Sequence, residues 1–225
     1  MTIQNDILNH YTEVGHGKPL LLFHGNGEDS SYFKHQIEYF SPHYRVIAVD
    51  TRWHGSTPRG TAPFTLQQFA DDFYALMQHL RLDKAHILGF SDGGNIAMLL
   101  GIKHPECVDK LILAGANMFP TGLKSSELLP MFPQYCKALL GQHKRRAALL
   151  RLMMYEPTID PKDLQRITAP TLVIAGDDDM VEQSHTELIA KSLPNSRLCI
   201  LPGDHFISRR QPQPFNEAVA AFLAE

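Results

Sequence analysis

The chain has 225 residues, of which 44% are hydrophobic and 20% charged, and its formal net charge is −3. This length and composition are typical of one globular domain that buries about 70% or more of its unfolded surface. The small negative charge argues against a dedicated nucleic-acid binder, which carries a basic face. One dense basic run, at residues 143–146, is interpreted as a solvated helix face.

Cysteine usage and hydropathy predict the compartment. The three cysteines are far apart and include no C-x-x-C pair, which excludes a disulfide framework and a zinc–cysteine site. Residues 1–18 are polar, without the apolar core of a signal peptide, and no apolar run is long enough to span a bilayer. We therefore expect a cytoplasmic protein whose partner is a small-molecule substrate, with no nucleic acid and no membrane. A homodimer is left open.

Six short apolar runs recur along the chain, as expected for parallel strands that are buried on both faces. A weak alternation at residues 7–12 and a glycine-rich turn at residues 15–18 precede them. The six runs are residues 19–23, 45–49, 85–90, 110–114, 171–175 and 197–201.

Helical patterns separate most of these runs, and they cover residues 31–40, 66–80, 95–103, 184–192 and 214–223. Strands that alternate with helices imply crossover connections and a mostly parallel sheet covered on both faces. The predicted fold class is therefore α/β, with a doubly wound sheet.

One region breaks the alternation. Residues 117–167 contain five prolines and many leucines and methionines, but no strand-like run, and the region is longer than an ordinary connection. We interpret residues 118–167 as a small helical cap insertion over the carboxyl edge of the sheet. Residues 1–117 and 168–225 then form the core. An ordinary pair of crossover helices is the alternative.

A G-x-S-x-G motif at residues 89–93 joins a predicted strand to a predicted helix. A serine at such a sharp turn has strained backbone angles, and glycines two residues to either side leave room for it. The helix N-terminus that follows favours negative charge. The motif alone is weak evidence for a nucleophilic serine, and the assignment depends on whether the other residues of a catalytic set occur in the right order.

Polar residues follow the other predicted strands, where open α/β sheets place their ligands. Gly176 to Asp179 and Pro202 to His205 follow the last two runs, so that a serine, a carboxylate and a histidine occur in the order Ser…Asp…His. In such a set, the imidazole takes the proton of the serine and the carboxylate orients the imidazole.

This order resembles the α/β-hydrolase superfamily over nearly the whole chain. The matching segments are H-G-N-G at 24–27, D-x-R-x-x-G-S at 50–56, G-F-S-D-G at 89–93, G-x-x-D at 176–179 and P-G-D-H at 202–205. Two departures are Trp53, where relatives usually have glycine, and a short N-terminus that leaves room for one strand fewer at the antiparallel edge.

The resemblance implies roles for individual residues. Ser91 would be the nucleophile, Asp179 the acid and His205 the base, while the backbone N–H groups of Asn26 and Asp92 would form an oxyanion hole. Asp177 and Asp178 remain alternatives as helix-capping carboxylates. We interpret His24 and His185 as packing or hydrogen-bonding residues, and Asp50 and Arg52 as residues that order their loop.

The segments G-x-S-D-G-G at 89–94 and G-A-N at 115–117 are similar to the biphenyl-hydrolase-like or valacyclovir-hydrolase branch. The resemblance implies that Asp92 accepts the ammonium group of an amino-acid ester. The alternative is that Asp92 only caps its helix. Trp53, Met118 and Phe119 are further candidates for substrate contact.

The predicted function is a serine hydrolase that cleaves a small ester, thioester or amide through an acyl-enzyme, with carboxylesterase activity favoured. A C–C bond hydrolase or a lactonase would use the same residues. Haloalkane dehalogenation is disfavoured, because it needs a carboxylate in place of Ser91. No metal or organic cofactor is implied. The alternative of another class is a non-catalytic ligand-binding protein that retains the fold.

Overall fold

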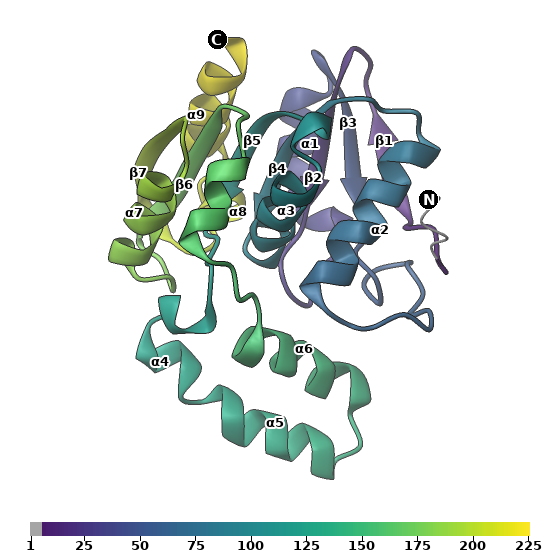
Figure 1. Cartoon of the computed structure of the whole chain (residues 1–225), viewed down its shortest axis with the longest axis vertical. Helices are drawn as coiled ribbons and strands as arrows, with labels where there is room; N and C mark the ends of the chain where they lie inside the picture. Colours follow the sequence, from purple (N-terminus) through teal and green to yellow (C-terminus); the bar gives the residue numbers. More distant parts are fainter. Residues whose placement is uncertain (1–5) are drawn as a thin grey trace.

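A computed structural model describes residues 6–225, which contain a seven-stranded sheet in the order β1-β3-β2-β4-β5-β6-β7 (Figure 1). β1 pairs antiparallel with β3, and the other neighbouring strands are parallel. The strands are β1 (Tyr11–Val14), β2 (Lys18–Phe23), β3 (Tyr44–Val49), β4 (Ala85–Phe90), β5 (Val108–Ala114), β6 (Thr171–Asp178) and β7 (Ser196–Asp204). The predicted α/β class is confirmed.

Helices cover both faces of this sheet. In Figure 1, α2, α3 and α7 lie on the near face, whereas α1 and α9 lie behind the sheet. The α-helices are α1 (Lys34–Phe40), α2 (Leu66–His79), α3 (Asp92–Lys103), α4 (Ser125–Leu128), α5 (Met131–Leu140), α6 (Lys144–Tyr155), α7 (Gln183–Ser192), α8 (Ile207–Arg210) and α9 (Pro212–Ala224). Short 3₁₀ helices are η1 (Ser30–Phe33), η2 (Pro105–Cys107), η3 (Pro120–Gly122) and η4 (Pro161–Arg166).

The core consists of two apolar layers, one on each face of the sheet. The first layer packs side chains of α2, α3 and α7, such as Phe69, Ile96 and Ile189, against the sheet. The second packs η1, α1, α8 and α9 against the opposite face, with Phe33 and Phe215 fully buried. Because consecutive strand residues point to opposite faces, a strand between two such layers must be apolar throughout. This explains the continuous apolar runs.

Element ends differ most from the predictions where polar residues continue a strand or a helix. α3 begins at Asp92 rather than at residue 95, and β6 and β7 continue three residues beyond the predicted ends. β1 begins at Tyr11, later than the predicted alternation at residues 7–12. Hydrophobic patterning cannot detect the extensions of α3, β6 and β7, because the added residues are glycine, proline and aspartate.

The segment between β5 and β6 contains α4, α5 and α6, which project from one end of the sheet in Figure 1. The backbone N–H of Lys124 donates to Met180, and that of Ile159 donates to Met118. Arg145 Nε donates to the carbonyl of Trp53 at 2.8 Å, which joins α6 to the loop after β3. The boundaries 118–167 of the predicted insertion stay a prediction. In residues 6–225, no helix is long and apolar enough to cross a membrane.

Arg52 holds the loop after β3 in place through buried ion pairs. Its guanidinium is fully buried, and it donates from Nε and Nη2 to the two carboxylate oxygens of Asp72, both at 2.8 Å. A further bond of 2.7 Å joins Nη2 to Asp6. Such a bidentate pair fixes orientation as well as charge. The predicted loop-ordering role of Arg52 has this physical basis.

We expect Asp72→Ala to lower the free energy of unfolding by about 3–5 kcal/mol, because it removes the bidentate carboxylate that faces a fully buried guanidinium. Asp71→Ala is the matched control. Its partial exposure and its pair with Lys103 limit the effect to about 1 kcal/mol or less. Urea unfolding curves of the two variants measure the difference, and equal losses would contradict this account of Arg52.

Candidate active site

The site lies where the order of strands reverses. β2 and β3 extend the sheet to one side of β4, and β5 to β7 extend it to the other. The loops after β2 and β4 therefore diverge at this point and leave a crevice at the carboxyl ends of the strands. Ser91 directly follows β4, the fourth of the seven strands.

Ser91 occupies a strained turn between β4 and α3. Its backbone angles are φ 54° and ψ −120°, a region that residues with a Cβ rarely adopt. A Cβ on Gly89 would lie 2.3 Å from the carbonyl oxygen of Gly93, and one on Gly93 would lie 1.9 Å from that of Phe23. The two glycines of the motif are thus required by contact with neighbouring backbone.

The structure brings Ser91, His205 and Asp179 together as a hydrogen-bonded chain. His205 Nε2 lies 3.0 Å from Ser91 Oγ, and His205 Nδ1 lies 2.6 Å from Asp179 Oδ1. Asp179 Oδ1 also accepts the backbone N–H of Val181 at 3.0 Å. With Nδ1–H donating to the carboxylate, the free lone pair of Nε2 faces the hydroxyl. Asp179, at spacing three after Gly176, is thus the aspartate in contact with the imidazole.

Gly115 is a site residue that our sequence analysis did not assign. It has φ +58°, and a Cβ there would lie 2.8 Å from His205 Cε1 and 3.2 Å from Asp179 Oδ2. Only glycine leaves space for the imidazole in this position. Gly115 belongs to the G-A-N segment at 115–117, whose resemblance to the biphenyl-hydrolase-like branch implied no role for this glycine.

Asn26 and Asp92 meet through their side chains. Asn26 Nδ2 donates to Asp92 Oδ2 at 2.8 Å, and more weakly to the carbonyl of Leu149 in α6 at 3.3 Å. Asn95 Nδ2 lies 3.4 Å from Asp92 Oδ1. In residues 6–225, the side chain of Asp92 bonds to these amide groups and to no backbone N–H, so helix capping does not describe its contacts.

The Asp92 carboxyl is electrostatically unusual. Burial raises the pKa of Asp92 to about 6, although the bond from Asn26 lowers it, and the nearby Glu156 carboxylate raises it further. Burial also raises the pKa of Glu156, which accepts the backbone N–H of Leu66 at 2.7 Å. A buried carboxylate of this kind is favoured only while its hydrogen-bond donors stay in place.

Glu28 is a second residue that the sequence analysis missed. Burial raises its pKa to about 7, against the opposing effects of a hydrogen bond from the Gly25 backbone and of the charges on Arg209 and His205. Its Oε2 atom is buried without a partner in the described part of the chain. A glutamate after a glycine-rich turn normally indicates a solvated loop, so the sequence held no signal for this position.

The three other candidates for substrate contact lie in different surroundings. Trp53 has φ 62° and packs edge-on against Phe64. Met118 is fully buried in the first core layer, and Phe119 packs edge-on against His185. A role of these side chains in substrate binding stays a prediction.

The remaining motif histidines make fixed hydrogen bonds. His24 Nε2 accepts the backbone N–H of Thr51 at 3.0 Å, and His185 Nε2 accepts that of Met118 at 2.9 Å. His54 Nε2 accepts the N–H of Gly27 at 3.1 Å, and burial lowers the pKa of His54 to about 3, which keeps the ring neutral. These bonds order the loops around Ser91.

The two aspartates before Asp179 are turned to other partners. Asp177 Oδ1 accepts the backbone N–H of Gly203 at 2.9 Å, and Asp178 pairs with Lys124 at 3.0 Å. Neither caps α7.

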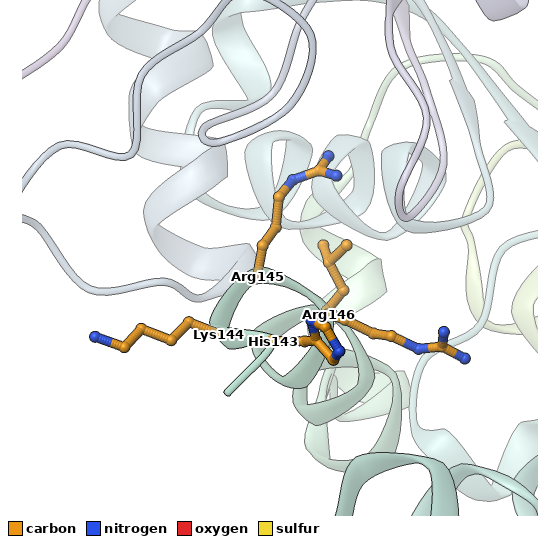
Figure 2. A pocket seen from close by; sticks show the side chains of 5 residues that line it. His143, Lys144, Arg145 and Arg146 are labelled. Carbon is orange, nitrogen blue, oxygen red and sulfur yellow. The ribbon is translucent and has the colours of Figure 1, made fainter. Parts of the chain in front are cut away.

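Of two cavities at this end of the sheet, one shares only Leu149 with the surroundings of Asn26, and the other is lined by site residues. One, of about 570 Å³, is lined by Leu149 and by four basic side chains at the start of α6. Figure 2 shows Arg145 pointing away from Lys144 and Arg146. The other, of about 310 Å³, is lined by residues that include Lys124, Asp179 and His205. Within residues 6–225, no group of His, Cys, Asp and Glu could hold a metal ion.

Known proteins share this fold and sequence pattern. The enol-lactonase named 3-oxoadipate enol-lactonase 2, from Acinetobacter baylyi, is 28% identical over 256 residues, covering 99% of this chain and 95% of the relative. A thermophilic esterase from Thermogutta terrifontis superposes with a TM-score of 0.78 at 25% identity, covering 97% and 93% of the two chains. The enol-lactonase of Burkholderia xenovorans, at 20% identity and a TM-score of 0.83, shows the fold alone over 98% of each chain.

Two family models match the chain, each over more than half of its length. Residues 84–214 match a serine hydrolase family, FSH1. Residues 18–148 match the family described as the alpha/beta hydrolase fold, and the chain belongs to this family.

Proposed function

We propose that the chain is a serine hydrolase that cleaves a small carboxylic ester through an acyl-enzyme. The observation that carries the proposal is the continuous hydrogen-bonded chain from Ser91 Oγ through the His205 imidazole to the Asp179 carboxylate, with distances of 3.0 and 2.6 Å. A hydroxyl is a poor nucleophile unless a base takes its proton, and this arrangement supplies the base and its orienting group.

In the acylation step, Ser91 Oγ attacks the carbonyl carbon while His205 Nε2 takes the hydroxyl proton. The carbonyl oxygen becomes an oxyanion, which the backbone N–H groups of Asn26 and Asp92 stabilise. In support, Asp92 is the first residue of α3, where N–H groups have no partner within the helix. When the intermediate collapses, the C–O bond breaks and His205 returns the proton to the leaving alcohol.

Deacylation repeats these steps with water. The oxygen of the water molecule attacks the acyl carbon while His205 takes a proton from that water. The tetrahedral intermediate then releases Ser91 Oγ, which recovers the proton from His205. The carboxylate of Asp179 stabilises the imidazolium formed in each half of the cycle. The products are a carboxylic acid and an alcohol, so atoms and charges balance without a cofactor.

Lactonase activity is the second candidate, and the similarity to 3-oxoadipate enol-lactonase 2 favours it. A lactone is a cyclic ester, so the same steps open its ring. C–C bond hydrolysis stays an alternative, and so does a ligand-binding protein without turnover. Asp92 as the acceptor of a substrate ammonium group also stays a prediction.

We expect Ser91→Ala to lower kcat/KM for a p-nitrophenyl ester by at least about 10⁴-fold with an unchanged melting temperature, because the attacking atom is lost. Initial rates and thermal melts measure the two effects. Asn195→Asp, an exposed position at the opposite end of the sheet, serves as the control and should keep full activity. Turnover that survives in a folded Ser91→Ala variant would contradict the proposal.

We expect Gly115→Ala to lower kcat/KM by about 10²-fold, because its Cβ would displace the imidazole of His205. Gly17→Ala, at the far end of β2, also places a Cβ at a positive φ, +100°, so it imposes backbone strain without touching the site. Kinetics and unfolding curves of the pair separate the two effects. Similar activity in both variants would remove Gly115 from the site.

A further inference from the structure

We propose that the hydrogen bond between the side chains of Asn26 and Asp92 is a clamp that sets the separation of the two N–H groups in the oxyanion hole. Both side chains are then positioning residues, in addition to the backbone role given to each. The inference rests on the proposed function, because it assigns work to the side chains of the same two residues.

The two residues come from separate elements. Asn26 lies in the loop after β2, and Asp92 is the first residue of α3. Because the two N–H donors of the oxyanion hole belong to different elements, no single element fixes the distance between them. A position error of about 1 Å can lower the rate by a factor of about 10². The bond of 2.8 Å between Asn26 Nδ2 and Asp92 Oδ2 joins the two parts directly beside the N–H groups.

The clamp continues into the fold. On the Asp92 side, Asn95 Nδ2 lies 3.4 Å from Asp92 Oδ1 and donates to Asn117 Oδ1 at 3.0 Å. The backbone N–H of Asn117 donates back to Asn95 Oδ1 at 2.8 Å, and Asn95 is fully buried. The chain of amides and one carboxylate thus links the loops after β2, β4 and β5, which are neighbours at the edge of the crevice.

The charge of Asp92 fits this role. A carboxylate only accepts hydrogen bonds, so Asn26 can only present its amide NH₂ group to it, and the orientation of that amide is determined. Charge-assisted bonds of this kind are shorter and stronger than neutral ones. An ammonium group bound to Asp92 would share either Oδ2 with Asn26 or Oδ1 with Asn95.

The test exchanges donor and acceptor. Asn26→Asp places two carboxylates face to face, and we expect kcat for a neutral p-nitrophenyl ester to fall by about 10²-fold with KM nearly unchanged, as for loss of an oxyanion donor. Asp92→Asn keeps an acceptor oxygen and should lose less than about 10-fold. The double variant Asn26→Asp/Asp92→Asn rebuilds the pair in reverse and should recover most of the activity lost by Asn26→Asp.

The controls separate this inference from the proposed function. Fluorophosphonate labelling of Ser91 in the wild-type protein tests the nucleophile alone, so an unlabelled, inactive wild type would refute the proposed function. With a labelled wild type, unchanged kcat in Asn26→Asp, or a double variant no faster than Asn26→Asp, would refute the clamp. Asn195→Asp controls for the added charge and should match wild type.

A matched pair of substrates distinguishes the ammonium hypothesis. We compare an amino-acid ester with the same ester lacking its amine, using the Asp92→Asn variant. The clamp predicts an equal change for both substrates. A loss confined to the amino-acid ester would overturn the clamp and assign the carboxylate to substrate binding.

Discussion

The strained backbone of Ser91 is the constraint on which the rest of the site depends. A φ of 54° at a residue with a Cβ holds only because Gly89 and Gly93 let β4, α3 and the β2 loop approach within backbone contact. The turn places the hydroxyl at the reversal point of the sheet and starts α3 immediately behind it. His205 and the N–H groups beside the hydroxyl reach it because the loops of neighbouring parallel strands end at the same edge.

The surroundings of Ser91 are polar but largely buried, which is costly for folding unless each group is paired. The buried guanidinium of Arg52 is paired with Asp72, and the buried carboxyl of Asp92 accepts a hydrogen bond from Asn26. Burial nevertheless raises the pKa of Asp92 to about 6 and that of Glu28 to about 7. The loops of the site are therefore stabilised by specific hydrogen bonds, whereas the sheet beneath them is stabilised by apolar burial.

The parts of this molecule that local sequence patterns encode could be predicted from the sequence. The apolar strands and the fold class follow from the hydrophobic runs, and the order of residues at strand ends indicates a serine, a carboxylate and a histidine. The choice of Asp179 and His205 as the partners of Ser91 was implied by the resemblance to the α/β-hydrolase superfamily. Gly115 and the Asn26–Asp92 bond were not predicted, because they depend on close packing between loops of different strands, which neither the apolar runs nor the motifs specify. The polar ends of β6 and β7 were missed because a strand that leaves the core no longer has the apolar residues by which it is predicted.

The most direct test of the account is covalent labelling with a fluorophosphonate probe, followed by location of the adduct by mass spectrometry. The probe reacts with an activated serine whatever the natural substrate is. We predict one adduct on Ser91 in the wild-type protein, and its loss in a folded His205→Ala variant, because the hydroxyl then has no base. A folded wild-type protein that remains unlabelled, or an adduct on another serine, would contradict the account.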